Sequence, residues 1–125
     1  MNRRAAIRMT DEERDAMLAI PHLNCTLATL GPSGFPQLTA MWFARIDGLL
    51  HFATYARSQK IKNLERNPCC SVLIEDGVDY AELRGYSVEG KASILIDPEL
   101  AGDVMLEITR RRGLLPDDPP EQAVQ

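Results

Sequence analysis

Residues 57–68 concentrate the side chains of this chain that are best suited to bind an anion. The pattern predicts a short helix with Ser58 as its N-cap, because a serine hydroxyl accepts a hydrogen bond from a free N–H of the first turn. Arg57 precedes the helix, and Lys60 and Lys62 fall near its start, beside unpaired N–H groups and the positive end of the helix dipole. Lysines there disfavour an isolated helix, and a bound phosphate would offset that cost. The alternative is a solvated surface helix whose lysines contact only water.

Side chains for acid–base, nucleophilic or metal chemistry are scattered along the rest of the sequence. His22 and His51 are isolated and lack the spacing of metal ligands. Cys25, Cys69 and Cys70 form no C-x-x-C motif, and their odd number argues against a disulfide framework, so we interpret all three as small buried apolar side chains. The sequence therefore predicts no metal site and assigns no catalytic residue. If the protein is an enzyme, a bound cofactor carries the chemistry.

Composition narrows the possible partners. The 125 residues are enough for one domain with a core, and 45% of them are hydrophobic. Fourteen Lys and Arg against eighteen Asp and Glu give a net charge of −4, which argues against a nucleic-acid binder with a basic face. No apolar run reaches the roughly 18 residues that a membrane span needs, and the N-terminus leads into acidic residues instead of an apolar signal segment. We expect a cytoplasmic protein that contacts neither membranes nor nucleic acids.

Hydrophobic alternation predicts that strands surround the cationic helix. The predicted strands are 24–30, 37–46, 49–54, 69–75 and 80–96. A turn at 31–34 and a two-residue hairpin at Asp47-Gly48 keep neighbouring strands antiparallel. Gly85 and Gly90 predict a bulge or a close backbone approach in the last strand.

The strand at 37–46 is the clearest of these, and its two faces differ in character. One face is uniformly apolar and is expected in the core: Leu38, Ala40, Trp42, Ala44 and Ile46. The other face begins polar, as in a strand that lines a cleft: Gln37, Thr39, Met41, Phe43 and Arg45. Trp42 is accordingly expected in the core or at a subunit interface.

Two further helices flank the strands. A capping box at Thr10 and Glu13 opens the first, and Pro21 ends it. Asp97 caps the second, whose final arginines at 110–112 complement the helix dipole. Residues 1–113 are expected to form one domain, mainly β with short helices, arranged as a small antiparallel barrel. The acidic, proline-rich residues 114–125 are expected to be disordered.

Four segments, in this order, resemble the flavin/deazaflavin split β-barrel family: 27–37, 41–43, 58–68 and 88–92. These are the pyridoxamine-phosphate-oxidase-like proteins, and the chain is similar especially to their F420-dependent oxidoreductase branch. The resemblance implies an antiparallel split β-barrel that forms a homodimer, with two cofactor clefts at the interface. Members usually continue past the last helix into closing strands, so the resemblance implies that this chain is either a short form or truncated.

The resemblance also implies roles for individual residues. The segment that grips the cofactor phosphate corresponds to Arg57, Ser58, Lys60, Lys62 and Asn63, with Lys60 at the lysine of the motif. The strand along the flavin or deazaflavin ring corresponds to Gln37, Leu38, Thr39, Ala40 and Met41. Members commonly carry a proline where this chain has Ala40-Met41, so the ring contacts are expected to differ there. Tyr80 falls where the partner subunit contributes an aromatic side chain.

These inferences predict a redox enzyme in which reduced F420 delivers a hydride to a small conjugated or heteroaromatic acceptor. FMN is the alternative cofactor, as in a pyridoxamine-phosphate-oxidase-like enzyme. A second class stays open, namely a non-catalytic protein that binds F420, FMN or haem for storage, sensing or delivery. A third, an adapter held by its dimer interface alone, predicts no cofactor affinity.

Overall fold

Two antiparallel sheets and three α-helices make up the part of the chain that the computed structural model describes, residues 8–113. The larger sheet has the strand order β2-β1-β5-β6, and the smaller one pairs β3 with β4. The strands are β1 (Cys25–Leu30), β2 (Pro36–Met41), β3 (Ala44–Ile46), β4 (Leu49–His51), β5 (Cys69–Asp76) and β6 (Arg84–Lys91). The helices are α2 (Asp11–Leu18), α3 (Gln59–Arg66) and α4 (Pro98–Arg111), and a 3-10 turn, η1, covers Tyr80–Glu82. This is the mainly antiparallel β architecture with short helices that the sequence predicts.

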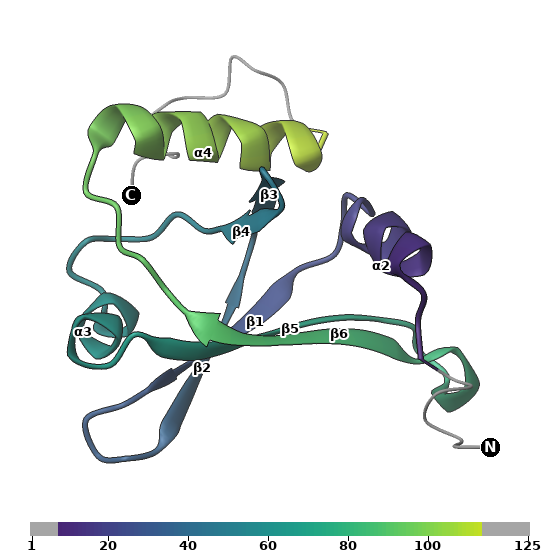
Figure 1. Ribbon diagram of the computed structural model, residues 1–125, viewed down its shortest axis with the longest axis horizontal. Coiled ribbons are helices and arrows are strands. Elements are labelled where there is room, and N and C mark those ends of the chain that lie inside the picture. The colour runs from purple at the N-terminus through teal and green to yellow at the C-terminus, as the bar shows by residue number, and fades with distance from the viewer. Residues whose placement is uncertain (1–7, 114–125) are drawn as a thin grey trace.

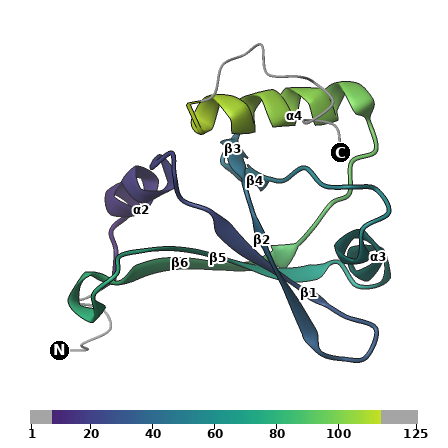
Figure 2. The same ribbon diagram turned by 180° about the vertical axis from the view of Figure 1, so that it is seen from behind.

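The elements are stacked on one side of the larger sheet. Figure 1 shows α4 over the β3–β4 hairpin, which lies between α4 and that sheet, and Figure 2 shows the same order from behind. In both views α2 and α3 lie near opposite ends of the sheet. On its other face, Leu38 of β2 and Leu73 of β5 are 69% and 40% exposed. Large apolar side chains on this face of the sheet are therefore open to solvent in the single chain.

Local capping signals determine where the helices begin. The Thr10 Oγ1 accepts a hydrogen bond from the Glu13 N–H (N···O 3.1 Å), and the Glu13 Oε1 accepts one from the Thr10 N–H (3.1 Å). This is the predicted capping box, and Asp97 caps α4 as predicted. α2 ends at Leu18, shortly before Pro21. No helix within residues 8–113 is long and apolar enough to cross a membrane.

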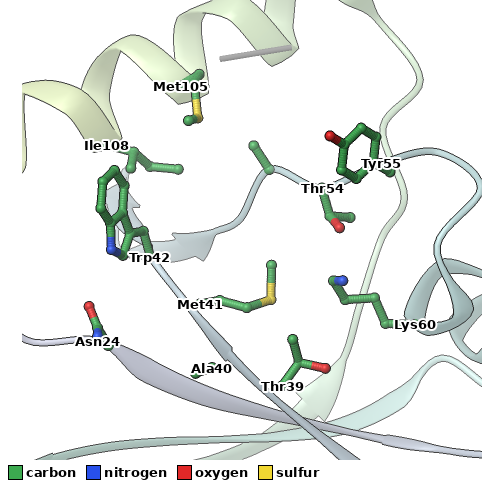
Figure 3. Close-up of a pocket in the computed structure, with 11 residues that line it drawn as sticks. Asn24, Thr39, Ala40, Met41, Trp42, Thr54, Tyr55, Lys60, Met105 and Ile108 are labelled. Atoms are coloured by element: carbon green, nitrogen blue, oxygen red, sulfur yellow. The ribbon is translucent and has the colours of Figure 1, made fainter. Parts of the chain in front are cut away.

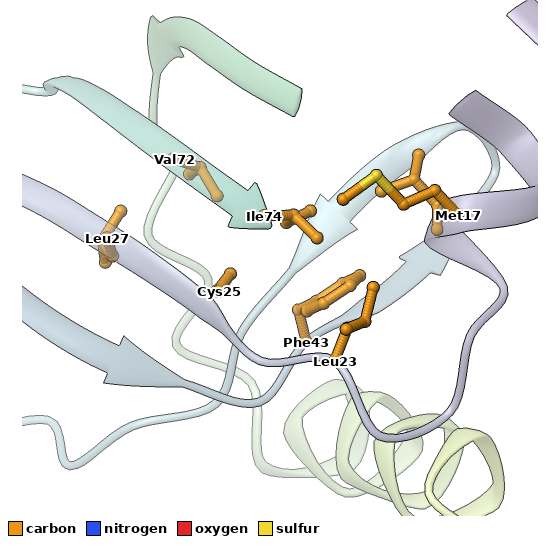
Figure 4. Close-up of a cluster of buried hydrophobic side chains, with 8 residues drawn as sticks. Met17, Leu23, Cys25, Leu27, Phe43, Val72 and Ile74 are labelled. Carbon is orange, nitrogen blue, oxygen red and sulfur yellow. The ribbon is translucent and has the colours of Figure 1, made fainter. Parts of the chain in front are cut away.

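Two clusters of buried side chains form the core. The larger joins α2, β1, β5 and the segment after β2, as Figure 4 shows: Met17, Leu18, Leu23, Cys25, Leu27, Phe43, Val72 and Ile74. The smaller joins β3 to α4 and consists of Ala44, Val104 and Ile108. Burial of one large apolar side chain stabilises a fold by about 1.5–3 kcal/mol. Each cluster therefore holds one helix against the strands.

The prediction of one strand at 37–46 is wrong. β2 ends at Met41, and the chain then passes to β3 in the other sheet. Phe43, expected to line a cleft, is fully buried, because the break turns its side chain into the core cluster. Members of the predicted core face are instead exposed, namely Leu38, Ala40 and Trp42. The alternating pattern runs through the break, so sequence alone could not locate it.

The C-terminal strand is also shorter than predicted, and it has no bulge. β6 pairs with β5 without interruption from Cys69–Lys91 to Asp76–Arg84, so Gly85 and Gly90 lie within regular pairing. Residues 80–82, expected as strand, form η1. The reason is the turn at Gly77, which has φ 99° and passes so close to the Glu82 carbonyl that a side chain would not fit. The strand predicted at 49–54 likewise ends at His51.

The cysteines do not share one environment. Cys25 is buried, Cys70 is half-buried, and Cys69 is exposed, so the prediction that all three are buried is wrong for Cys69. Cys69 and Cys70 point to opposite faces of β5, and Cys69 belongs to the open face of the sheet. Burial raises the pKa of the Cys25 thiol to about 11.

The arginines at the end of α4 tether this helix to the loop between α2 and β1. The Arg111 guanidinium donates to the carbonyl oxygens of Leu18 (3.2 Å), Ile20 (2.7 Å), Pro21 (3.3 Å) and Leu23 (3.3 Å). Its central carbon lies 3.9 Å from the centroid of the Phe43 ring. Burial lowers the pKa of Arg111. Cations do lie at the helix C-terminus, as predicted. The direct contacts of Arg111, however, account for its position better than the helix dipole does.

Candidate functional site

A pocket of about 420 Å³ lies between the end of β2, the segment after β4, the start of α3 and α4. Its lining residues are Asn24, Thr39, Ala40, Met41, Trp42, Ala53, Thr54, Tyr55, Lys60, Met105 and Ile108. Figure 3 shows Lys60 and Asn24 on opposite sides of this pocket, with Met41 of β2 between them and Met105 of α4 above. The pocket therefore has a cationic end near α3, an apolar middle, and a second polar end near Trp42.

Four of the sequence-predicted site residues line this pocket. Thr39, Ala40 and Met41 come from the last residues of β2, and Lys60 comes from the first turn of α3. They are 19 to 21 residues apart in sequence, and the chain passes through the whole β3–β4 hairpin between them. The structure thus brings the two predicted segments to one cavity.

The start of α3 presents free backbone donors at the cationic end. Ser58 caps the helix as predicted, since its Oγ accepts from the Ile61 N–H (3.4 Å). The Lys62 N–H donates to the Ser58 carbonyl (3.2 Å), which begins the helical ladder. The N–H groups of Gln59 and Lys60 have no hydrogen-bond partner among residues 8–113. Two free N–H groups beside a lysine form the arrangement that binds phosphate at helix N-termini.

The other two predicted cations lie outside the pocket. Arg57 and Lys62 are exposed, and neither lines it. Within residues 8–113, neither they nor Lys60 form an ion pair. All three positive charges are therefore available to an anionic ligand, Lys60 by contact and the others through their field.

Asn63 and Gln37 are occupied by contacts within the protein. Asn63 is fully buried, and its Nδ2 donates to the Thr29 Oγ1 (3.0 Å) and to the Gln37 Oε1 (2.7 Å). Its Oδ1 accepts from the Gln59 Nε2 (2.9 Å) and from the Arg66 Nη2 (3.4 Å). These bonds fix α3 against β1 and β2. Asn63 and Gln37 therefore position the walls of the pocket, and neither of them lines it.

Two predicted contacts lie away from the pocket of this chain. Leu38 points to the open face of the larger sheet, because side chains alternate along β2 and its neighbours Thr39 and Gln37 point the other way. Tyr80 is 91% exposed in η1, at the end of the β5–β6 hairpin opposite α3. Tyr80 therefore does not line this pocket, and its contribution to a partner subunit stays a prediction.

Several lining residues were missed by the sequence reasoning. Thr54 and Tyr55 lie a few residues before α3, and their closeness in sequence to Ser58 could have indicated them. Met105 and Ile108 lie three residues apart on the apolar stripe of α4, which looks like ordinary core from the sequence. Nothing in the sequence around Asn24 indicated that it lines the pocket. Within residues 8–113 no group of three His, Cys, Asp or Glu side chains could hold a metal ion.

The end of the pocket near Trp42 is held by another arginine of α4. The Arg112 Nη1 donates to the Asn24 Oδ1 (2.8 Å). The Arg112 guanidinium carbon also lies 4.4 Å from the centroid of the Trp42 ring, a cation–π contact. Asn24 and Trp42 both line the pocket, so one side chain of α4 holds two parts of its wall.

Comparison with known proteins identifies the family. The family model of pyridoxamine 5'-phosphate oxidase matches residues 7–124. The chain belongs to the pyridoxamine 5'-phosphate oxidase family. This confirms the resemblance and the split-barrel fold class that the sequence predicts. The domain boundary at residue 113 is not tested, and residues 114–125 lie outside the described residues. Among curated proteins, none matches this chain.

Solved structures of the same fold include proteins of different kinds. A conserved hypothetical protein from Mycobacterium tuberculosis is 43% identical with a TM-score of 0.83, over 94% of this chain and 73% of that one. An F420 reductase is 30% identical with a TM-score of 0.67, over 81% of this chain and 77% of that one. A heme storage protein from Vibrio cholerae is 20% identical with a TM-score of 0.65, over 85% and 78%, and at that identity shows the fold alone. The family fold is thus found both in an F420 reductase and in a heme storage protein.

Proposed function

We propose that this member of the pyridoxamine 5'-phosphate oxidase family is an F420-dependent oxidoreductase. Its pocket takes the deazaflavin, and a small conjugated acceptor receives a hydride there. The observation that carries the proposal is the joining of the Thr39–Met41 wall of β2 to Lys60 at the start of α3 in one cavity. The 30% identity to an F420 reductase supports F420 over FMN.

The cationic end fits the phosphate of such a cofactor. Lys60 lines the pocket, and the free N–H groups of Gln59 and Lys60 stand at the positive end of the α3 dipole. Arg57 and Lys62 add positive charge outside the cavity. An anionic tail would lie here with charge-assisted hydrogen bonds, which are stronger than neutral ones.

The middle of the pocket fits a flat ring system. Thr39, Ala40 and Met41 form one wall, and Met105 faces them from α4. When bound, reduced F420 supplies the hydride, so the protein needs only to orient the two reactants and exclude water. Lys60 and Tyr55 are the titratable side chains in the lining. This agrees with a site whose redox chemistry belongs to the cofactor.

A second copy of the chain is proposed to cover the open sheet face. Leu38, Leu73 and Ala28 lie there, and the first two are 69% and 40% exposed. A specific homodimer should bury at least about 1,200 Å² in total. It would also let Tyr80 reach the cleft of the partner. Sedimentation at micromolar concentration should show a dimer, and a monomer would remove both the interface and the shared cleft.

The decisive experiment is parallel titration with F420, FMN and haem, followed by competition between F420 and FMN. F420 should bind most tightly, and reduced F420 should be oxidised faster by a conjugated acceptor when the protein is present. Binding without faster oxidation would indicate a carrier. A clear preference for FMN would replace the cofactor while keeping the site. If the protein bound none of the three, only the adapter hypothesis would remain.

A further inference from the structure

The polar end of the pocket near Trp42 contains a hydrogen-bond donor of fixed direction. An asparagine amide can turn either its oxygen or its nitrogen toward a ligand. Arg112 removes this freedom, because a guanidinium can only donate and its Nη1 lies 2.8 Å from the Asn24 Oδ1. The oxygen of Asn24 is thereby occupied. Its Nδ2 has no hydrogen-bond partner among residues 8–113, so an N–H donor stays available at the pocket wall.

Arg112 also fixes the aromatic neighbour of this donor. Its guanidinium lies 4.4 Å from the centroid of the Trp42 ring. Trp42 and Asn24 are therefore held by one side chain, which comes from the C-cap of α4. Arg112 does not itself line the pocket, so its effect there passes through the two residues that do.

The space beside this donor suits a planar apolar molecule. Trp42 and Ile108 lie at this end in Figure 3, next to the space between Met41 and Met105 that is proposed for the deazaflavin ring. Thioether side chains are flexible and make favourable contacts with aromatic rings. Lys60 lies on the opposite side. The Arg112 cation at this end is engaged by Asn24 and Trp42 and does not line the pocket.

We propose that the Trp42–Asn24 end is the acceptor subsite and that it takes a planar conjugated carbonyl compound. The Asn24 N–H donates to the carbonyl oxygen, and Arg112 is a positioning residue. This inference rests on the proposed function. As a carbon of the acceptor gains the hydride, negative charge develops on that oxygen, and the Asn24 donor stabilises it. A proton from water completes the two-electron reduction, and the cofactor is left oxidised.

The test compares two ligands with the same ring system and different oxygen content, menadione and 2-methylnaphthalene. Titrations use the full chain labelled with nitrogen-15 and no cofactor. Trp42 is the only tryptophan of the chain, so its single indole N–H signal reports binding at this end. The side-chain amide signals of Asn24 are assigned by their loss in Asn24→Ala. The protein should bind menadione about tenfold more tightly than 2-methylnaphthalene, the worth of one good hydrogen bond.

Variants separate the donor from the residue that positions it. Asn24→Ala and Arg112→Ala should each reduce the affinity ratio to about one to threefold, since the donor is absent or free to turn. Arg112→Lys keeps a donor for the Asn24 Oδ1 and should retain more of the ratio than Arg112→Ala. The control is Arg110→Ala, which removes a neighbouring arginine that pairs with Glu107 (2.6 Å) outside the pocket. It should leave the tenfold ratio intact.

Several results would overturn the proposal. Equal binding of the two ligands, or no binding of either, would remove the acceptor subsite. An unchanged ratio in Arg112→Ala, or a ratio lost equally in Arg110→Ala, would remove the positioning role. Because the titration contains no cofactor, a failure to bind F420 would not affect it. F420 binding together with equal affinities for the two ligands would refute this inference alone.

Discussion

Two groups of cations lie at helix ends in this protein, and they are used in opposite ways. At the C-terminus of α4, Arg110, Arg111 and Arg112 each have partners: a carboxylate, four carbonyls, and the side chains of Asn24 and Trp42. At the N-terminus of α3, Lys60 and its neighbours form no ion pair among residues 8–113. The helix dipole favours the first group and opposes the second.

This difference separates structural charge from functional charge. The α4 arginines sit where both the dipole and direct contacts stabilise them, so each is engaged within the fold. The α3 lysines sit where the fold gives them no compensation. A cationic cluster at the unfavourable end of a helix, with one lysine lining a cavity, is better explained by a ligand than by stability. Substitutions in the α4 group should therefore affect stability, and substitutions in the α3 group should affect ligand binding.

The largest expected effect is on stability, from Arg111→Ala. The substitution removes the guanidinium donor of four backbone carbonyls near α2, of which, among residues 8–113, only that of Ile20 keeps another backbone donor, the Leu23 N–H (3.4 Å). It also removes the contact with Phe43. Hydrogen bonds to charged groups contribute about 1.5–3 kcal/mol, and an unsatisfied buried group costs about 1–3 kcal/mol. We expect the free energy of unfolding, measured in urea, to fall by about 3 kcal/mol or more.

Arg110→Ala is the matched control for this loss. It removes an arginine from the same turn, but one whose exposed ion pair with Glu107 contributes about 0–1 kcal/mol. Similar losses in the two variants would mean that the helix dipole, and not the Arg111 contacts, stabilises this end of α4.

Lys60→Ala should have the next largest effect, and on binding instead of stability. Losing a hydrogen bond to a charged phosphate should weaken F420 binding by about 1.5–3 kcal/mol, measured by titration. The free energy of unfolding should change by about 0.5 kcal/mol or less, because the side chain has no ion pair in the described residues. Lys62→Ala should weaken binding less, because Lys62 is exposed and outside the pocket. Equal losses of affinity in Lys60→Ala and Lys62→Ala would mean that the overall charge of α3, and not a contact by Lys60, causes the effect.

The third effect is an alkaline loss of stability at Cys25, whose thiol interacts with the Arg111 charge. Burial raises the pKa of Cys25 from 9.0 to about 11, although the positive charge of Arg111 opposes this. The folded chain then holds the thiol proton more tightly than the unfolded chain does. Its contribution to stability is complete below pH 9.0 and is lost as pH rises to about 11. Urea unfolding of Cys25→Ala should show a shallower decline over this range than the unchanged protein, and parallel declines would contradict the assignment.

Local sequence signals predicted the helix starts and one tight turn. Thr10, Ser58 and Asp97 cap helices as expected, because a cap depends on residues only two or three positions away. Asp47-Gly48 forms the predicted hairpin, with φ 52° and 78° at its two residues. These features need no knowledge of the rest of the fold.

Features set by distant contacts were not predictable in this way. Phe43 is buried beneath Arg111, a residue far away in sequence, and nothing near position 43 indicates it. The arginines at the end of α4 donate to oxygens 88 to 93 positions away. The sequence could therefore indicate only that cations are favoured at a helix C-terminus. For the candidate site, the place of Lys60 in the first turn of a predicted helix already indicated an anion site, and the resemblance added its phosphate role and residues 39–41. Asn24 and Met105 needed the tertiary structure, because they come from segments with no shared pattern.

The buried amide of Asn63 has a consequence for how this pocket can evolve or be redesigned. It bonds β1, β2 and α3 into one unit, so the cationic end and the β2 wall keep a constant spacing. The opposite wall is carried by α4, which is attached separately through its arginines. Substitutions on α4 can therefore reshape one wall of the pocket while the spacing between Lys60 and the β2 wall stays fixed. Under the proposed function, such a chain can acquire a new substrate without first losing its cofactor.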